Sequence, residues 1–113
     1  MKKRSVAFLV LGAMMAANAA LAADVAQLAK DKHCFDCHST NSDRVGPSFR
    51  DIGRRFNGLN NAKPMLAHAI EVGTDNSSTA YHWGPTKMPP GSVRVPVSPD
   101  EAALLADYVL SFH

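Results

Sequence analysis

The 113-residue chain has few cysteines and few aromatic residues, and it contains neither an internal repeat nor a low-complexity segment. There are two cysteines and one tryptophan. A structural zinc site needs four ligands, and here there is no third cysteine, while His68 and His82 stand alone in the sequence. The formal net charge is only +2, so the composition gives no support for binding to nucleic acid. The informative residues are an N-terminal apolar segment and two short motifs.

Residues 1–23 have the features of a secretory signal peptide. Three basic residues at positions 2–4 precede an uncharged apolar stretch at 6–17, and an A-x-A site predicts cleavage after Ala22 or Ala23. The apolar stretch is short for a membrane span, which needs about 20 residues. An uncleaved anchor is the alternative. In both cases we expect the folded part outside the cytoplasm, in the periplasm.

Residues 24–113 are predicted to form one domain of 90 residues. The residues before Asp24 hold three of the 12 basic residues and none of the 10 acidic ones, so the remainder has a formal net charge of −1. A chain of this length buries only about 60–65% of its unfolded surface. We therefore expect a small core, no nucleic-acid partner and no membrane span after cleavage.

The first motif is C-x-x-C-H, formed by Cys34, Cys37 and His38. On a helical turn, residues three and four apart share a face, so both thiols and the imidazole can reach one flat group. This is the attachment motif of c-type haem. A thioredoxin-like site would need a βαβ setting, and a plain disulfide would leave His38 unexplained. Both cysteines are then used by haem, and we expect no structural disulfide.

The second motif lies in residues 80–90, which have no helical or strand periodicity. It contains Trp83 and, immediately before two prolines, Met88. A methionine thioether is a known sixth ligand to haem iron, and the prolines stiffen the chain around it. Three other side chains could chemically serve as ligands: Met65, His68 and His82.

Four helices are expected. The first begins at Asp24 and runs into Cys34; the second carries an apolar face of Phe49, Ile52 and Phe56. The third ends at Gly73. The last follows a capping box at 98–101 with proline at its first position. Residues 91–97 are expected to form a loop.

Together these features resemble the small bacterial class I cytochromes c. The resemblance covers essentially the whole of 24–113, and Met88 follows His38 by 50 residues. It implies an all-α fold of four to five short helices around one covalent haem. It further implies His38 and Met88 as iron ligands, a Pro47 carbonyl that accepts a hydrogen bond from His38, and a Trp83 indole that reaches a haem propionate.

The chain departs from that family at three places. Members carry on their third helix an arginine that meets a propionate, where this chain has Ala69. His68 or the Arg54–Arg55 pair could substitute. An asparagine after the M-P-P sequence is Gly91 here, and the segment leading to the last helix is longer by several residues.

The resemblance implies electron transfer and no catalysis. With both axial positions of the iron filled, the expected role is a monomeric periplasmic carrier that meets respiratory redox proteins transiently. One alternative is a haem subunit bound permanently to a periplasmic dehydrogenase, for example one that oxidises inorganic sulfur. A gas sensor or peroxidase would need an open sixth position.

Overall fold

The computed structural model describes residues 21, 23–74 and 86–113, and within them the chain is helical. A first helix spans residues 23–31. It is followed by the 3-10 turn η1 (Cys34–Asp36), by α2 (Phe49–Phe56) and by α3 (Ala62–Val72). The 3-10 turn η2 (Gly91–Val93) and α4 (Pro99–Leu110) complete the described part, which contains no strand. The expected all-α fold is confirmed.

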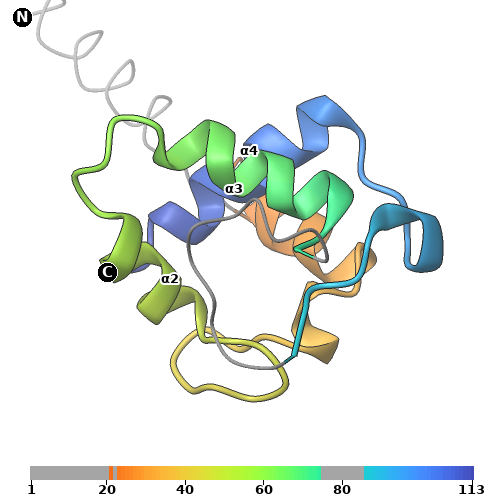
Figure 1. Ribbon diagram of the computed structural model, residues 1–113, viewed down its shortest axis with the longest axis horizontal. Coiled ribbons are helices and arrows are strands. Elements are labelled where there is room, and N and C mark those ends of the chain that lie inside the picture. Colours follow the sequence, from red (N-terminus) through yellow and green to blue (C-terminus); the bar gives the residue numbers. More distant parts are fainter. Residues whose placement is uncertain (1–20, 22, 75–85) are drawn as a thin grey trace, which may run out of the picture.

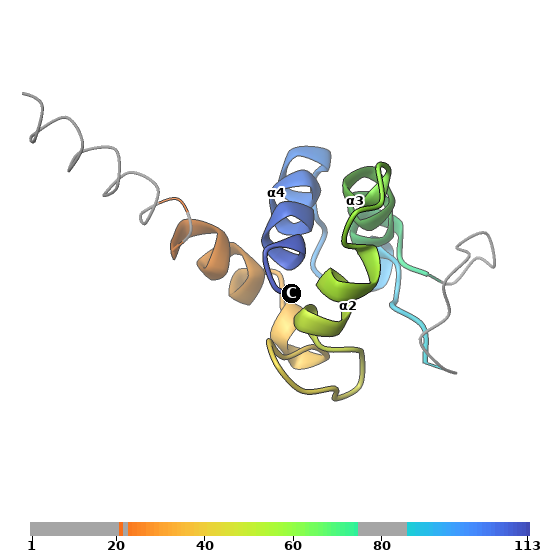
Figure 2. The ribbon, with the colours of Figure 1, turned by 90° about the vertical axis from the view of Figure 1, so that its left-hand side faces the viewer.

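Helices α2 and α3 both pack against α4. Its most extensive contacts are with α3 and the next most extensive with α2, and α3 and α4 lie side by side in both ribbon views (Figure 1, Figure 2). An ion pair of 3.1 Å between Lys32 Nζ and Glu101 Oε2 joins the segment after the first helix to the first turn of α4. Helices α2 and α3 thus pack against α4, and the ion pair ties the segment after the first helix to it.

The helix ends follow local chemistry. Ser48 caps α2 by accepting from the Asp51 N–H at 3.0 Å. The capping box of α4 is present in full, with Ser98 and Glu101 each accepting the other's backbone N–H. Gly73 ends α3 with a φ of 78°, a conformation that favours glycine. Residues 91–97 contain a single 3-10 turn and no strand, so the expectation of a loop is confirmed.

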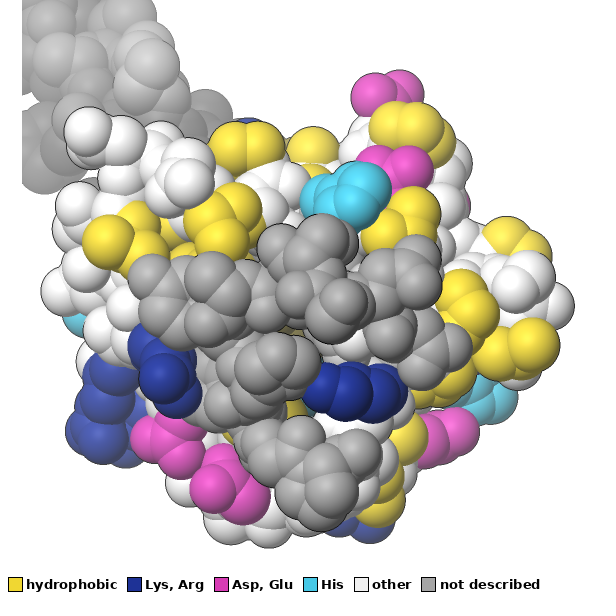
Figure 3. Space-filling model, viewed as in Figure 1, with side chains coloured by type: hydrophobic (Ala, Val, Ile, Leu, Met, Phe, Trp, Pro, Cys, Tyr) yellow, Lys and Arg dark blue, Asp and Glu magenta, His cyan; other side chains and the backbone are white. Residues whose placement is uncertain are grey.

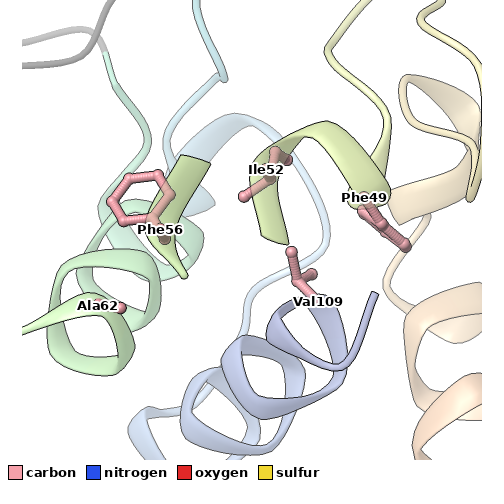
Figure 4. Packing of buried hydrophobic residues seen from close by; sticks show 5 residues of the cluster. All are labelled: Phe49, Ile52, Phe56, Ala62 and Val109. Carbon is pink, nitrogen blue, oxygen red and sulfur yellow. The ribbon is translucent and has the colours of Figure 1, made fainter. Parts of the chain in front are cut away.

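The apolar core is small and lies between α2, α3 and α4. Figure 4 shows five of its members, with Val109 of α4 beneath α2 on the side of Ile52 and Phe49. Among the described residues, alanine supplies four of the nine buried hydrophobic residues, and Leu105 is the single large apolar side chain that is less than 2% exposed. Within the described residues, no helix combines the length and apolar character that crossing a bilayer requires.

Candidate haem-binding site

The C-x-x-C-H residues lie on a helical turn of their own. The first helix does not run into Cys34 as expected, because His33 adopts a left-handed conformation with a φ of 61° and separates it from η1. Within the turn, the Cys37 and His38 N–H groups both donate to the Cys34 carbonyl, at 3.3 and 3.0 Å. The two thiols are free and half-buried. Burial raises the pKa of the Cys34 thiol, and the Arg94 cation opposes part of that rise.

The ring of His38 is held in one orientation. Its Nδ1 lies 2.7 Å from the Pro47 carbonyl oxygen, and the ring stacks on Phe49 with centroids 5.4 Å apart. A carbonyl only accepts, so Nδ1–H is the donor. Burial lowers the pKa of His38, with the Pro47 hydrogen bond acting in the opposite direction. In the neutral tautomer that results, Nε2 keeps its lone pair and can bind a metal.

Met88 is fixed by backbone contacts with the end of α3. The Thr74 N–H donates to the Met88 carbonyl at 2.9 Å, and the Met88 N–H donates to Thr74 Oγ1 at 2.8 Å. The approach requires glycine at position 73, because a Cβ there would lie 2.6 Å from the Met88 carbonyl oxygen. Two polypeptide segments 14 residues apart are thereby joined directly, and the Met88 side chain is half-buried.

A cavity of about 280 Å³ lies between these elements. One water needs about 10–15 Å³ in the same measure, so the space suits a group many times larger. His38, Met88 and both cysteines line it. The apolar wall comes from α2, α3 and α4: Phe49, Ile52, Phe56, Met65, Leu66, Ala69, Ile70, Leu105, Tyr108 and Val109.

This set of residues fits haem. A broad apolar ring needs an apolar cavity, its vinyl groups need two thiols, and its iron accepts imidazole and thioether ligands. No group of three or more histidine, cysteine or carboxylate side chains that could hold a metal ion occurs among the described residues. The cavity thus brings together Cys34, Cys37 and His38 of the first motif and Met88 of the second.

Of the other candidate residues, Met65 lies at the cavity and the rest lie away from it or outside the described residues. Met65 lines the cavity, whereas His68 is exposed on α3 and is not part of the wall. The Arg54–Arg55 pair is exposed on α2 and is likewise outside the lining. Trp83 and His82 lie outside the described residues. Arg94 does line the cavity, and sequence reasoning missed it; its only signal was a single charge among alternating valines.

Comparison with known proteins gives the family. The Cytochrome c family model matches residues 22–113. Cytochrome c-551 of Stutzerimonas stutzeri is 38% identical over 111 residues, which cover 98% of each chain. Cytochrome c-552 of Nitrosomonas europaea is 36% identical over 100 residues, covering 85% of this chain and 89% of that one.

Solved structures agree with this result. The crystal structure of wild-type Nitrosomonas europaea cytochrome c552 superposes with a TM-score of 0.67 at 34% identity, over 78% of this chain and 99% of that one. Class 1 cytochrome MtoD from Sideroxydans lithotrophicus ES-1, at 23% identity and a TM-score of 0.58, shares the fold. The cavity, its cysteines and these matches together show that the chain belongs to the cytochrome c family.

Proposed function

We propose that this chain carries single electrons between redox proteins of the periplasm, on one haem c held by Cys34, Cys37, His38 and Met88. Covalent haem c and electron transfer without catalysis follow from membership of the family and from the two free cysteines. The choice of ligands is supported by one observation above all. His38 and Met88, which come from distant parts of the chain, line the same cavity as both cysteines.

Each residue has a distinct role in this proposal. When bound, haem c supplies an iron that gains and loses one electron at a potential set by its axial ligands. Cys34 and Cys37 would hold the group through thioethers to its two vinyl groups. His38 binds through Nε2, because Nδ1–H is used by Pro47. Met88 would supply its thioether as the second protein ligand. An iron held by both side chains would have no site left for a substrate, which disfavours a peroxidase or gas sensor.

The assignment to the periplasm depends on residues 1–23, which we infer to be a cleaved signal peptide; all but two of them lie outside the described residues. The signal-peptide inference is supported by the basic residues, the apolar stretch and the A-x-A site in the sequence. We infer that residues 24–113 are the mature monohaem domain. Mass spectrometry of the exported protein should show a chain that begins after Ala22 or Ala23 and carries one haem. A full-length chain would contradict export with cleavage.

We infer that the protein is a monomeric carrier that binds its redox partners only transiently. On the face in Figure 3, basic and acidic side chains are interspersed, so neither sign dominates its described surface. Such a surface suits brief encounters with more than one redox protein through small interfaces. No observation favours a permanently bound dehydrogenase subunit. Co-elution with a larger catalytic chain at fixed stoichiometry would overturn the carrier proposal.

The ligand assignment is tested by Met88→Ala. The wild type should show the weak near-infrared sulfur-to-iron band when oxidised and should not bind carbon monoxide appreciably when reduced. Met88→Ala should lose the band, bind carbon monoxide and have a lower potential, because a soft neutral ligand favours the reduced iron. The matched control is Met65→Leu, which removes the other thioether on the cavity wall and should keep the band. A band that survives in Met88→Ala would refute the assignment.

A further inference from the structure

Arg94 has an unusual setting for a surface arginine. It follows η2, in the segment between Pro90 and Ser98, and its side chain reaches back to line the haem cavity. Both of its hydrogen bonds within the described residues go to backbone carbonyls, and none goes to a carboxylate. A half-buried cation that donates hydrogen bonds to main-chain carbonyls can hold the backbone segments that carry them in place.

The two carbonyls belong to the two segments that meet at Met88. Arg94 Nε donates to the carbonyl of Pro89, the residue after Met88, at 2.8 Å. A terminal nitrogen of the same guanidinium donates to the carbonyl of Ile70, in the last turn of α3. One planar group therefore bridges the Met88 segment (residues 86–90) and α3, next to the Thr74 contacts described above.

The end of α3 needs such a group. The last carbonyls of a helix lack partners within the helix, and the negative end of the dipole favours a nearby cation. Helix α3 carries no basic residue in its last turn. The Gly73 N–H bonds to Ala69, and the Thr74 N–H is used by Met88. Arg94 thus supplies from another segment the positive charge that the last turn of α3 lacks.

We propose that Arg94 is a positioning residue that holds the Met88 segment against the C-terminal end of α3 and so keeps the Met88 sulfur over the cavity. The inference rests on the proposed role of Met88 as an iron ligand. An external ligand can bind the iron only in molecules whose Met88 sulfur has moved away. The smaller the fraction of such open molecules, the weaker the apparent affinity for the external ligand. Arg94 lowers that fraction. Arginine suits this task because its fork holds two carbonyls at once.

The test is the affinity of the oxidised holoprotein for imidazole, followed by the visible spectrum. Arg94→Gln should tighten imidazole binding about tenfold, at the lower end of what a hydrogen bond to a charged group contributes. Arg94→Lys keeps the cation but cannot hold both carbonyls, so it should tighten binding by a smaller factor; it carries the test if Arg94→Gln does not accumulate. Arg50→Gln, at an exposed arginine of α2, is the matched control and should change nothing.

A double variant separates this role from a general effect of charge or stability. In a Met88→Ala background there is no sulfur to hold, so Arg94→Gln should alter imidazole affinity less than twofold. An equal tightening in both backgrounds, or none in the wild-type background, overturns the inference and leaves the proposed function intact. If Met88→Ala itself does not tighten imidazole binding, the ligand assignment fails and the inference fails with it.

Discussion

At the scale of single residues, the orientation of His38 depends on a missing side chain. Gly46 has no φ that requires glycine, yet a Cβ there would lie 2.7 Å from His38 Cε1. The glycine is needed for space, because the ring lies directly over it. The residue after it, Pro47, accepts the Nδ1–H bond. Two adjacent residues therefore set the position and the tautomer of the proposed iron ligand.

We expect Gly46→Ala to displace the His38 ring and to destabilise the holoprotein by about 1–3 kcal/mol, the usual range for overpacking. Guanidinium unfolding measures the loss of stability, and the paramagnetically shifted ring protons of the oxidised protein measure the displacement. Gly58→Ala is the matched control. Its φ of 79° also disfavours alanine, but the added Cβ would meet nothing within 4 Å, so stability should fall with the His38 signals unchanged. Unchanged His38 signals in Gly46→Ala would contradict this account.

The residues with intrinsic chemistry could be predicted from the sequence, whereas their supports could not. Cys34, His38 and Met88 were proposed from residue type and spacing, and all three line one cavity. Thr74 and Arg94 act through backbone groups of segments that meet only in the folded chain. No sequence pattern predicts such contacts between distant segments. His68 was offered as a propionate partner on sequence grounds, and it is exposed and outside the cavity wall.

At the scale of elements, the helix ends were predicted where a strong local signal exists. Gly73 and the capping box at Ser98 end and begin helices as expected, because left-handed glycine and reciprocal capping bonds are local devices. The first helix was predicted to reach Cys34 and does not. Its break is His33, a left-handed residue that is not glycine. Histidine is one of the few non-glycine residues enriched in the left-handed conformation. Because histidine also occurs commonly inside helices, its presence at position 33 did not predict a break.

The start of α4 should make stability depend on pH through Glu101. The Ser98 backbone N–H and then Lys32 lower the pKa of Glu101 below its ordinary value of 4.5. Because the pKa of Glu101 is lower in the folded than in the unfolded protein, its carboxylate contributes fully to stability above the unfolded pKa. That contribution is lost as the pH falls through the folded pKa. Glu101→Gln keeps the capping geometry and removes the charge. It should be less stable than the wild type at pH 7, and the difference should vanish below pH 4.5 toward the lower folded pKa.

The control for this prediction is Asp100→Asn, an exposed acid in the same first turn. It has no capping bond among the described contacts and should follow the wild type more closely. Unfolding in denaturant, repeated from neutral to acidic pH, gives the comparison. A stability difference for Glu101→Gln that stays constant across this range would exclude the charge as its source.

At the scale of the whole molecule, the apolar side chains of the protein alone form only a small core. Aromatic side chains gather on one side of the cavity, where Phe49 contacts both Tyr108 and Phe112 with centroids about 6 Å apart, at 6.0 and 5.9 Å. Alanine makes up four of the nine buried hydrophobic residues that the structure describes, and α2, α3 and the Met88 segment face the cavity. The fold is therefore organised around a space that haem fills, which the short length of the chain already suggested.

The size of that space predicts what happens without the cofactor. An apolar cavity of 280 Å³ left empty would cost about 7 kcal/mol at about 24 cal/mol per Å³, as much as the whole stability of many domains. Replacing both Cys34 and Cys37 by Ala prevents covalent attachment, so this double variant should be largely unstructured, with weak helical circular dichroism and no cooperative thermal transition. Met88→Ala keeps both thioethers and should remain helical and cooperative. A cooperative helical transition in the cysteine double variant without haem would show that the chain folds on its own, and that haem enters a site already formed.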